Sequence, residues 1–115
     1  MKTGTIFALA SGGAPAGIAV IRVSGSGAAA GYAALVGRAP GEPRRLIRVR
    51  LRDRAQGEEL DDGLAVWFPG PASFTGEDIV EFHVHGGRAV VTAILDALSG
   101  LEGYRLAEPG EHLQV

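Results

Sequence analysis

Residues 17–23 have the sequence GIAVIRV, an apolar run rich in β-branched side chains that only Arg22 interrupts. Such a run is typical of a buried strand. A shorter apolar run, TIFALA at residues 5–10, precedes it and ends at segment 11–15, whose glycines and proline predict a loop. The two runs therefore predict two adjacent central strands.

The rest of the chain alternates between helical and extended patterns. The alanine-rich stretch 28–36 ends at Gly37, which is typical of a helix and its stop. In chain order, the patterns predict a helix at 28–36, a hairpin of strands at 46–51 and 64–68, a loop at 69–76, a strand at 79–84, a helix at 89–98 and a short strand at 104–107. This order predicts an α+β fold of two layers, a mixed β-sheet with helices on one face.

Composition limits the class of protein. A chain of 115 residues, 46% of them hydrophobic, corresponds to one domain with a modest core. Its formal net charge of −2 excludes the global basic field of many nucleic-acid-binding proteins. The absence of cysteine excludes disulfides and thiolate metal sites. With neither a signal peptide nor a membrane helix in the pattern, we expect a soluble cytoplasmic protein without a membrane partner.

A glycine turn follows the second predicted strand. Gly25, Gly27 and Gly31 open the alanine-rich helix with a spacing that superficially resembles a dinucleotide fingerprint, and Arg44 and Arg45 could then meet a ribose phosphate of NADP. Because a hairpin follows instead of repeated strand-helix units, we favour a tight turn into a helix. A small NADP-dependent enzyme stays an alternative.

Three polar residues on one face of the 79–84 strand could in principle converge on a divalent ion. Glu81, His83 and His85 are spaced at i, i+2 and i+4, about 6.5 to 7 Å between successive Cα atoms. Apart from His112 no further histidine exists, and polar side chains on an exposed strand face need no ligand. We therefore expect no metal site, and a metal-dependent enzyme stays an alternative.

Two catalytic motifs are missing from the sequence. His85-Gly86-Gly87 resembles an oxyanion-hole loop, but no Gly-x-Ser-x-Gly elbow accompanies it. A Gly-x-x-x-x-Gly-Lys-Ser/Thr phosphate loop is excluded because Lys2 is the only lysine. We accordingly expect no catalytic residue in this chain.

Arginines occupy alternate positions of the 46–51 strand and its extension. They could contact an RNA backbone, but acidic residues follow closely and could neutralise them, leaving a solvated strand edge. The arginines are Arg48, Arg50, Arg52 and Arg54, and the acids are Glu58, Glu59, Asp61 and Asp62.

Arg22 is the most informative single residue. A guanidinium in an apolar strand is costly to bury unless an anion or several acceptors meet it. Glu77, Asp78 and Glu81 lie on a later strand and its entry loop, so one of them could be a structural partner. A bound ligand is an equally good explanation.

Four segments, in order, resemble the signature segments of the amino-terminal domain of MnmE (TrmE)-type tRNA-modification GTPases. They are residues 17–25, 68–78, 85–87 and 107–111, and the resemblance runs from about Thr5 to Glu111. It implies a fold similar to the tetrahydrofolate-binding domain of aminomethyltransferases and a homodimer formed through this domain. It also implies a bound 5-formyltetrahydrofolate or related tetrahydrofolate near the dimer contact.

The resemblance also assigns folate-binding residues. By position, Arg22 matches the family arginine associated with the folate, and Glu77 or Glu81 is the candidate carboxylate for the pterin. A pterin edge presents an amino group and a ring N–H to the two oxygens of a carboxylate, and an arginine complements formyl or carboxylate oxygens. Such a site orients a one-carbon carrier and needs no general base.

In the full-length family, the resemblance implies a helical domain and an inserted G domain that binds GTP, Mg²⁺ and K⁺. The resemblance implies, further, that the whole protein works with a flavin-dependent partner on the wobble uridine of tRNA. Here we expect a folate-binding and dimerisation domain at residues 1–111 and a divergent tail at 112–115, where His112, Leu113, Gln114 and Val115 replace the family's Phe-Thr and lysine-containing continuation. A purely structural dimerisation domain is the remaining alternative.

Overall fold

The computed structural model describes residues 4–11, 17–71 and 76–108. They form one six-stranded mixed sheet in the order β3-β4-β5-β2-β1-β6, with two helices. Neighbouring strands are antiparallel except β1 and β6, which are parallel. The elements are β1 (Thr5–Leu9), β2 (Ile18–Ser24), α1 (Ala28–Val36), β3 (Ile47–Asp53), β4 (Glu58–Phe68), β5 (Ile79–His85), α2 (Arg88–Ser99) and β6 (Tyr104–Leu106). The predicted α+β fold with a mixed sheet is confirmed.

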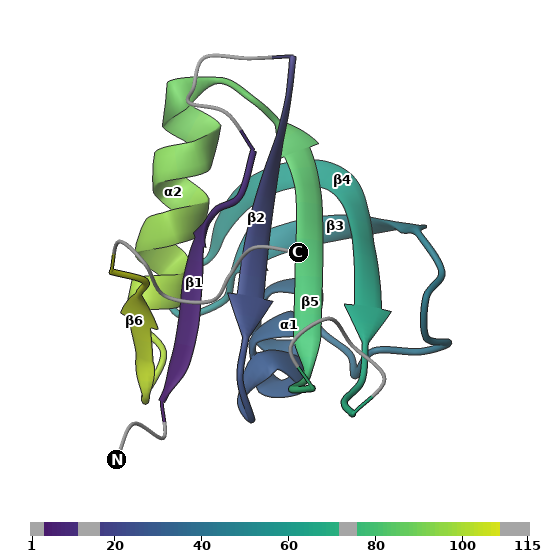
Figure 1. The fold of residues 1–115 in the computed structure, drawn as a ribbon. Coiled ribbons are helices and arrows are strands. Elements are labelled where there is room, and N and C mark those ends of the chain that lie inside the picture. The colour runs from purple at the N-terminus through teal and green to yellow at the C-terminus, as the bar shows by residue number, and fades with distance from the viewer. Residues whose placement is uncertain (1–3, 12–16, 72–75, 109–115) are drawn as a thin grey trace.

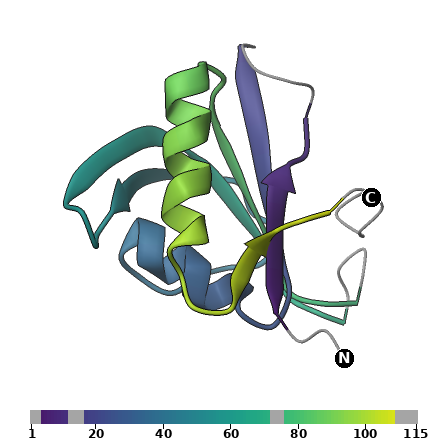
Figure 2. The same cartoon turned by 90° about the vertical axis from the view of Figure 1, so that its left-hand side faces the viewer.

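Both helices lie on the same side of the sheet, as Figure 2 shows. In Figure 1 the opposite, helix-free face of the sheet is toward the viewer. Similarity to the aminomethyltransferase domain stays a prediction. Within the described ranges, no helix is long and apolar enough to cross a membrane.

The core lies between the sheet and the helices. In the antiparallel register of β2 and β5, Ile21 is opposite Phe82 and Val23 is opposite Val80, and all four side chains are fully buried. From the helical layer, Ile94 of α2 joins them with no exposed surface. Burying each such side chain stabilises the fold by about 1.5 to 3 kcal/mol. Because successive side chains along a strand point to opposite faces of the sheet, the intervening residues of β2 and β5 lie on the helix-free face.

The strand predictions were correct in type and wrong in two details. β1 and β2 are adjacent, but β5 pairs with the other side of β2, so β2 and β5 occupy the centre and β1 does not. β4 begins at Glu58, six residues before the predicted strand 64–68, because Glu58 and Glu59 pair with Asp53 and Arg52 across a register shift. The 112–115 tail and part of the 69–76 loop lie outside the described residues.

Candidate functional site

Arg22 and Glu81 lie opposite each other on the two central strands, on the helix-free face. The same row across the sheet continues to Ala8 of β1 and Val66 of β4. Strands on both sides flank the pair, which explains why Glu81 retains only 8% of its surface. The expectation that this polar face is exposed was therefore wrong at Glu81.

The two side chains form an ion pair. Arg22 Nη2 lies 2.6 Å and Arg22 Nε lies 2.8 Å from Glu81 Oε2, and both side chains are only 11% exposed. The second carboxylate oxygen, Oε1, lies 3.1 Å from Nε2 of His83. Because both oxygens have partners, the Glu81 carboxylate is held in one orientation.

The other candidate carboxylates have different partners. Ser24 Oγ, itself buried, donates a hydrogen bond of 3.2 Å to Glu77 Oε1, and Asp78 Oδ1 accepts the Gly70 N–H at 2.9 Å. The structure thus joins Arg22 to Glu81 in an ion pair and places Glu77 beside the next polar residue of β2. Sequence reasoning missed Ser24, although its position two residues after Arg22 predicts the same face of the strand.

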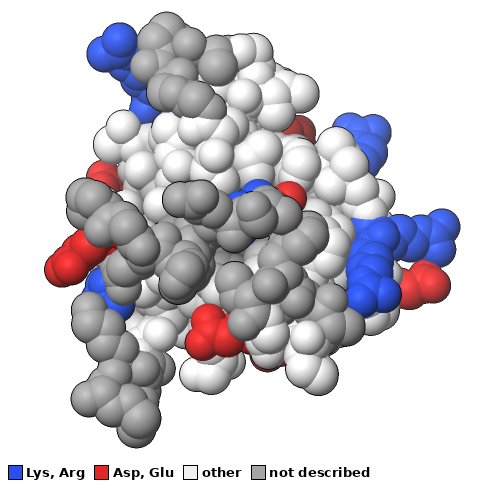
Figure 3. All heavy atoms as spheres, viewed as in Figure 1, with Lys and Arg blue, Asp and Glu red and all other residues white. Residues whose placement is uncertain are grey.

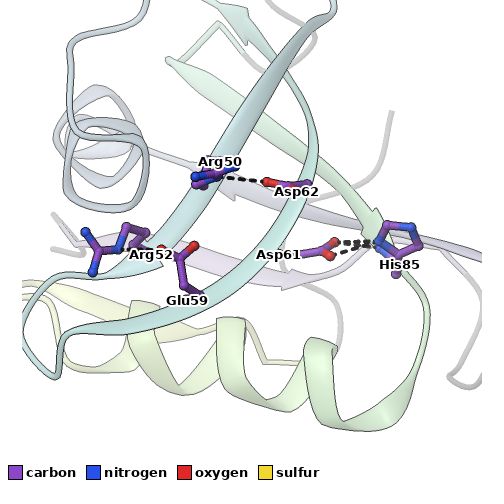
Figure 4. Close-up of polar contacts among 6 residues, drawn as sticks. All are labelled: Arg50, Arg52, Glu59, Asp61, Asp62 and His85. Atoms are coloured by element: carbon purple, nitrogen blue, oxygen red, sulfur yellow. Dashed lines mark hydrogen bonds and ion pairs between the residues drawn. The ribbon is translucent and has the colours of Figure 1, made fainter.

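The three residues considered for a metal site do not converge. His85 turns toward Asp61 of β4, with its Nδ1 2.8 Å from Asp61 Oδ1 and its backbone N–H donating to Asp61 Oδ2 at 2.9 Å (Figure 4). His83 instead contacts Glu81. Among the described residues, no group of three histidine or acidic side chains is arranged to hold a metal ion. His112 lies outside the described residues.

The glycines of the turn before α1 are packed against the protein itself. The Gly27 N–H donates to Thr5 Oγ1 at 2.8 Å, and the Tyr104 hydroxyl donates to the Gly27 carbonyl. A Cβ at Gly31 would overlap the Tyr104 hydroxyl. Burial raises the pKa of Tyr104 to about 12. The glycines therefore serve close packing, which supports the tight-turn interpretation over a dinucleotide site.

The arginines of β3 are largely matched by acids of β4. Arg50 Nε lies 3.2 Å from Asp62 Oδ1, and Arg52 Nε lies 3.2 Å from Glu59 Oε2 (Figure 4). In Figure 3 basic side chains gather at the right-hand edge of the face, over the start of β3, with acidic side chains nearby. Each exposed pair contributes about 0 to 1 kcal/mol. The local neutralisation expected from the sequence is thus present at these two arginines.

A groove of about 300 Å³ lies on the helix-free face, next to the Arg22–Glu81 ion pair. Apolar residues, two histidines and Arg48 are among the residues that line it. Its lining residues are Ile18, Arg48, Asp62, Gly63, Leu64, His83, Val84 and His85.

Comparison with known proteins gives consistent matches. A family model described as "GTP-binding protein TrmE N-terminus" matches residues 5–114. The protein named "tRNA modification GTPase MnmE" from Paramagnetospirillum magneticum is 60% identical over 107 residues, 93% of this chain and 24% of that protein. Its namesakes from Parvibaculum lavamentivorans and Rhodopseudomonas palustris are 55% and 56% identical over the same length. The chain spans about a quarter of the length of these relatives.

Proposed function

The chain belongs to the family of TrmE amino-terminal domains, and on this premise we propose that it is the tetrahydrofolate-binding and homodimerisation module of a tRNA modification GTPase. Its ligand would be 5-formyltetrahydrofolate or a related tetrahydrofolate, which carries a one-carbon unit. The module orients this carrier and has no turnover of its own.

The ion pair of Arg22 with Glu81 is the observation that carries the proposal. Two charged groups that are 11% exposed lose much of their hydration, and an apolar pair of similar volume would often stabilise a fold as well or better. A binding role explains why charges occupy the centre of this sheet face. The fixed orientation of Glu81, held by Arg22 and His83, is suited to recognition of a ligand.

The chemistry of the residues fits a folate. The amino group and ring N–H of a pterin edge can donate to one carboxylate, from Glu81 or from Glu77, and Arg22 can donate to formyl or carboxylate oxygens. Use of Glu81 requires the ligand to replace a contact of that carboxylate with Arg22 or His83. Glu77 is exposed, and its use requires the ligand to compete with the Ser24 hydroxyl, which donates to Glu77 Oε1.

The remaining activities would belong to the whole protein. We propose that GTP, with Mg²⁺ and K⁺, binds a separate G domain, and that a flavin-dependent partner acts with the protein on the wobble uridine of tRNA in the cytoplasm. The relatives' name, tRNA modification GTPase, supports GTP hydrolysis and tRNA modification as activities of the whole protein.

Calorimetric titration of the chain with 5-formyltetrahydrofolate tests the binding proposal. We expect saturable binding that is lost in Arg22→Ala and kept in Arg50→Ala, which removes only an exposed ion pair. Because Arg22→Ala leaves the buried Glu81 carboxylate with only its His83 contact, the double variant Arg22→Met with Glu81→Leu serves as a folded comparison without either charge. Wild-type binding that survives in the double variant would contradict the proposed site.

Sedimentation velocity tests the dimer. A stable dimer that binds no folate would favour the purely structural dimerisation domain. Saturable NADPH fluorescence changes, or metal retained after chelation, would favour the small-enzyme alternatives.

A further inference from the structure

A row of arginines runs along β3, the strand at one edge of the sheet. Arg48 and Arg50 are exposed and alternate with Val49 and Leu51, which are buried in the core. Arg52 continues the row beyond the register shift of the β3–β4 pair. Successive side chains on one face of a strand are about 7 Å apart. The strand therefore presents regularly spaced cations at an open edge of the fold.

The guanidinium groups of this row keep most of their hydrogen-bond donors unused. Within the described residues, Arg50 donates one side-chain hydrogen bond, from Nε to Asp62 Oδ1 at 3.2 Å, whereas the Arg48 side chain forms no hydrogen bond or ion pair. The contact of Arg52 with Glu59 also runs through Nε (Figure 4). An arginine has five N–H donors in a planar fork that matches two oxygens of one anion. The outer edges of these groups are thus open to an anionic partner.

The acids beside the row hold its arginines weakly. The side chains of Arg50 and Asp62 are 68% and 62% exposed, and those of Arg52 and Glu59 are 39% and 62% exposed. Such exposed ion pairs contribute little to stability, because water screens the charges and the long side chains lose freedom. An incoming anion can consequently replace either acid, and at Arg48 no exchange is needed.

The surroundings of the row favour a nucleic-acid backbone over a protein partner. From residue 48 to residue 54, all the exposed residues are arginines. Protein interfaces are centred on apolar or aromatic anchors, and this segment exposes none. Cations spaced along a line instead match the successive phosphates of a nucleic-acid strand, which supply much of the affinity in such complexes.

We propose that the β3 arginine row, formed by Arg48, Arg50 and Arg52, binds the phosphate backbone of an RNA. The inference rests on the proposed function, because tRNA modification by the whole protein would bring an RNA to this domain. Contacts to phosphate oxygens position the RNA and do not read its sequence. Charges farther away than about 8 Å are largely screened at physiological ionic strength, so the net charge of −2 does not prevent a local contact.

Fluorescence anisotropy of a fluorescein-labelled tRNA transcript, measured at several KCl concentrations, tests the proposal. Each phosphate contact contributes about −0.7 to −0.9 to the slope of log K against log salt, so three arginines should give a slope of about −2 to −3. We expect Arg48→Gln to weaken binding about tenfold at low salt and to lower the magnitude of the slope by about one. Arg88→Gln removes the same charge from the exposed start of α2 and should change neither quantity.

A second pair of variants tests the competition between acid and RNA. Asp62→Asn should tighten RNA binding, because it releases Arg50 and removes a negative charge from the row. Asp96→Asn, which removes an exposed acid from α2, is the matched control and should leave the affinity unchanged.

Three results would overturn the proposal: no binding of the transcript, equal losses in Arg48→Gln and Arg88→Gln, or displacement of the RNA by polyglutamate at equal charge concentration. The last result would assign the row to an acidic protein. Titration of the same variants with 5-formyltetrahydrofolate separates this proposal from the proposed function. Folate binding without RNA binding refutes only the arginine row, and RNA binding without folate binding refutes only the folate site.

Discussion

Arg22 and Glu81, 59 residues apart in the chain, face each other on β2 and β5, with Arg22 Nη2 2.6 Å from Glu81 Oε2. The pair lies on the sheet face opposite the helices, so the hydrophobic core and the charged site share two strands without sharing side chains. Alternation along each strand separates the two environments. The fold therefore remains stable only while both buried charges keep their partners.

Removal of one charge from this pair should be strongly destabilising. We expect Glu81→Ala to lower the free energy of unfolding by about 3 kcal/mol, because the Arg22 guanidinium is left buried without its carboxylate. Urea denaturation followed by circular dichroism measures the change. Asp62→Ala is the matched control, since it breaks the exposed pair with Arg50 and should cost less than about 1 kcal/mol. Equal effects of the two substitutions would contradict a buried, coupled pair.

Gly31 and Tyr104 should be coupled energetically. Gly31→Ala places a Cβ against the Tyr104 hydroxyl, and such overpacking typically costs about 1 to 3 kcal/mol. Tyr104→Phe alone removes a hydrogen bond to the Gly27 carbonyl and should cost about 1 kcal/mol. The loss of stability measured for the double variant should be smaller than the sum of the losses in the two single variants. Tyr104→Phe removes the hydroxyl group that the new methyl group at position 31 would meet. Additive losses in thermal unfolding would show that the two positions are independent.

Stability should fall at high pH through Tyr104. Burial raises the pKa of Tyr104 to about 12 from an ordinary value of 10.0, so the unfolded chain loses this proton at lower pH than the folded one. The contribution of the protonated Tyr104 phenol to the free energy of unfolding is fully present below pH 10 and is lost as pH rises toward 12. Urea midpoints of wild type should therefore decline over this window. The decline should be shallower in Tyr104→Phe, and an identical slope in both proteins would argue against the buried phenol as the cause.

The end of α1 should depend on the left-handed conformation of Gly37. Its φ of 95° is unfavourable for other residues, and its N–H donates to the Ala33 carbonyl at 2.8 Å. We expect Gly37→Ala to lower the free energy of unfolding by about 1 to 2 kcal/mol. Gly41→Ala is the matched control, because nothing lies within 4 Å of the position of its Cβ. Chemical denaturation of the two variants should separate strain at the helix end from the general effect of replacing glycine.

The site could be predicted from sequence only in part. Arg22 was identifiable because an isolated cation in an apolar strand requires a partner, but Glu77, Asp78 and Glu81 were equivalent candidates. Pairing of β2 with β5 selected Glu81 because it set Arg22 directly opposite that residue. The contact of His83 with Glu81, and the turn of His85 away toward Asp61, likewise depend on neighbouring strands that the sequence does not specify.

The sequence by itself determined the α+β class, the family, the two helices and the type of each strand, because periodicity, glycine positions and family motifs are local properties of the chain. Tertiary structure alone decided that β5 lies beside β2, that Glu81 is buried and that a groove opens beside it. Strand order and register depend on contacts between distant segments, and such contacts are fixed only when the whole core packs at once.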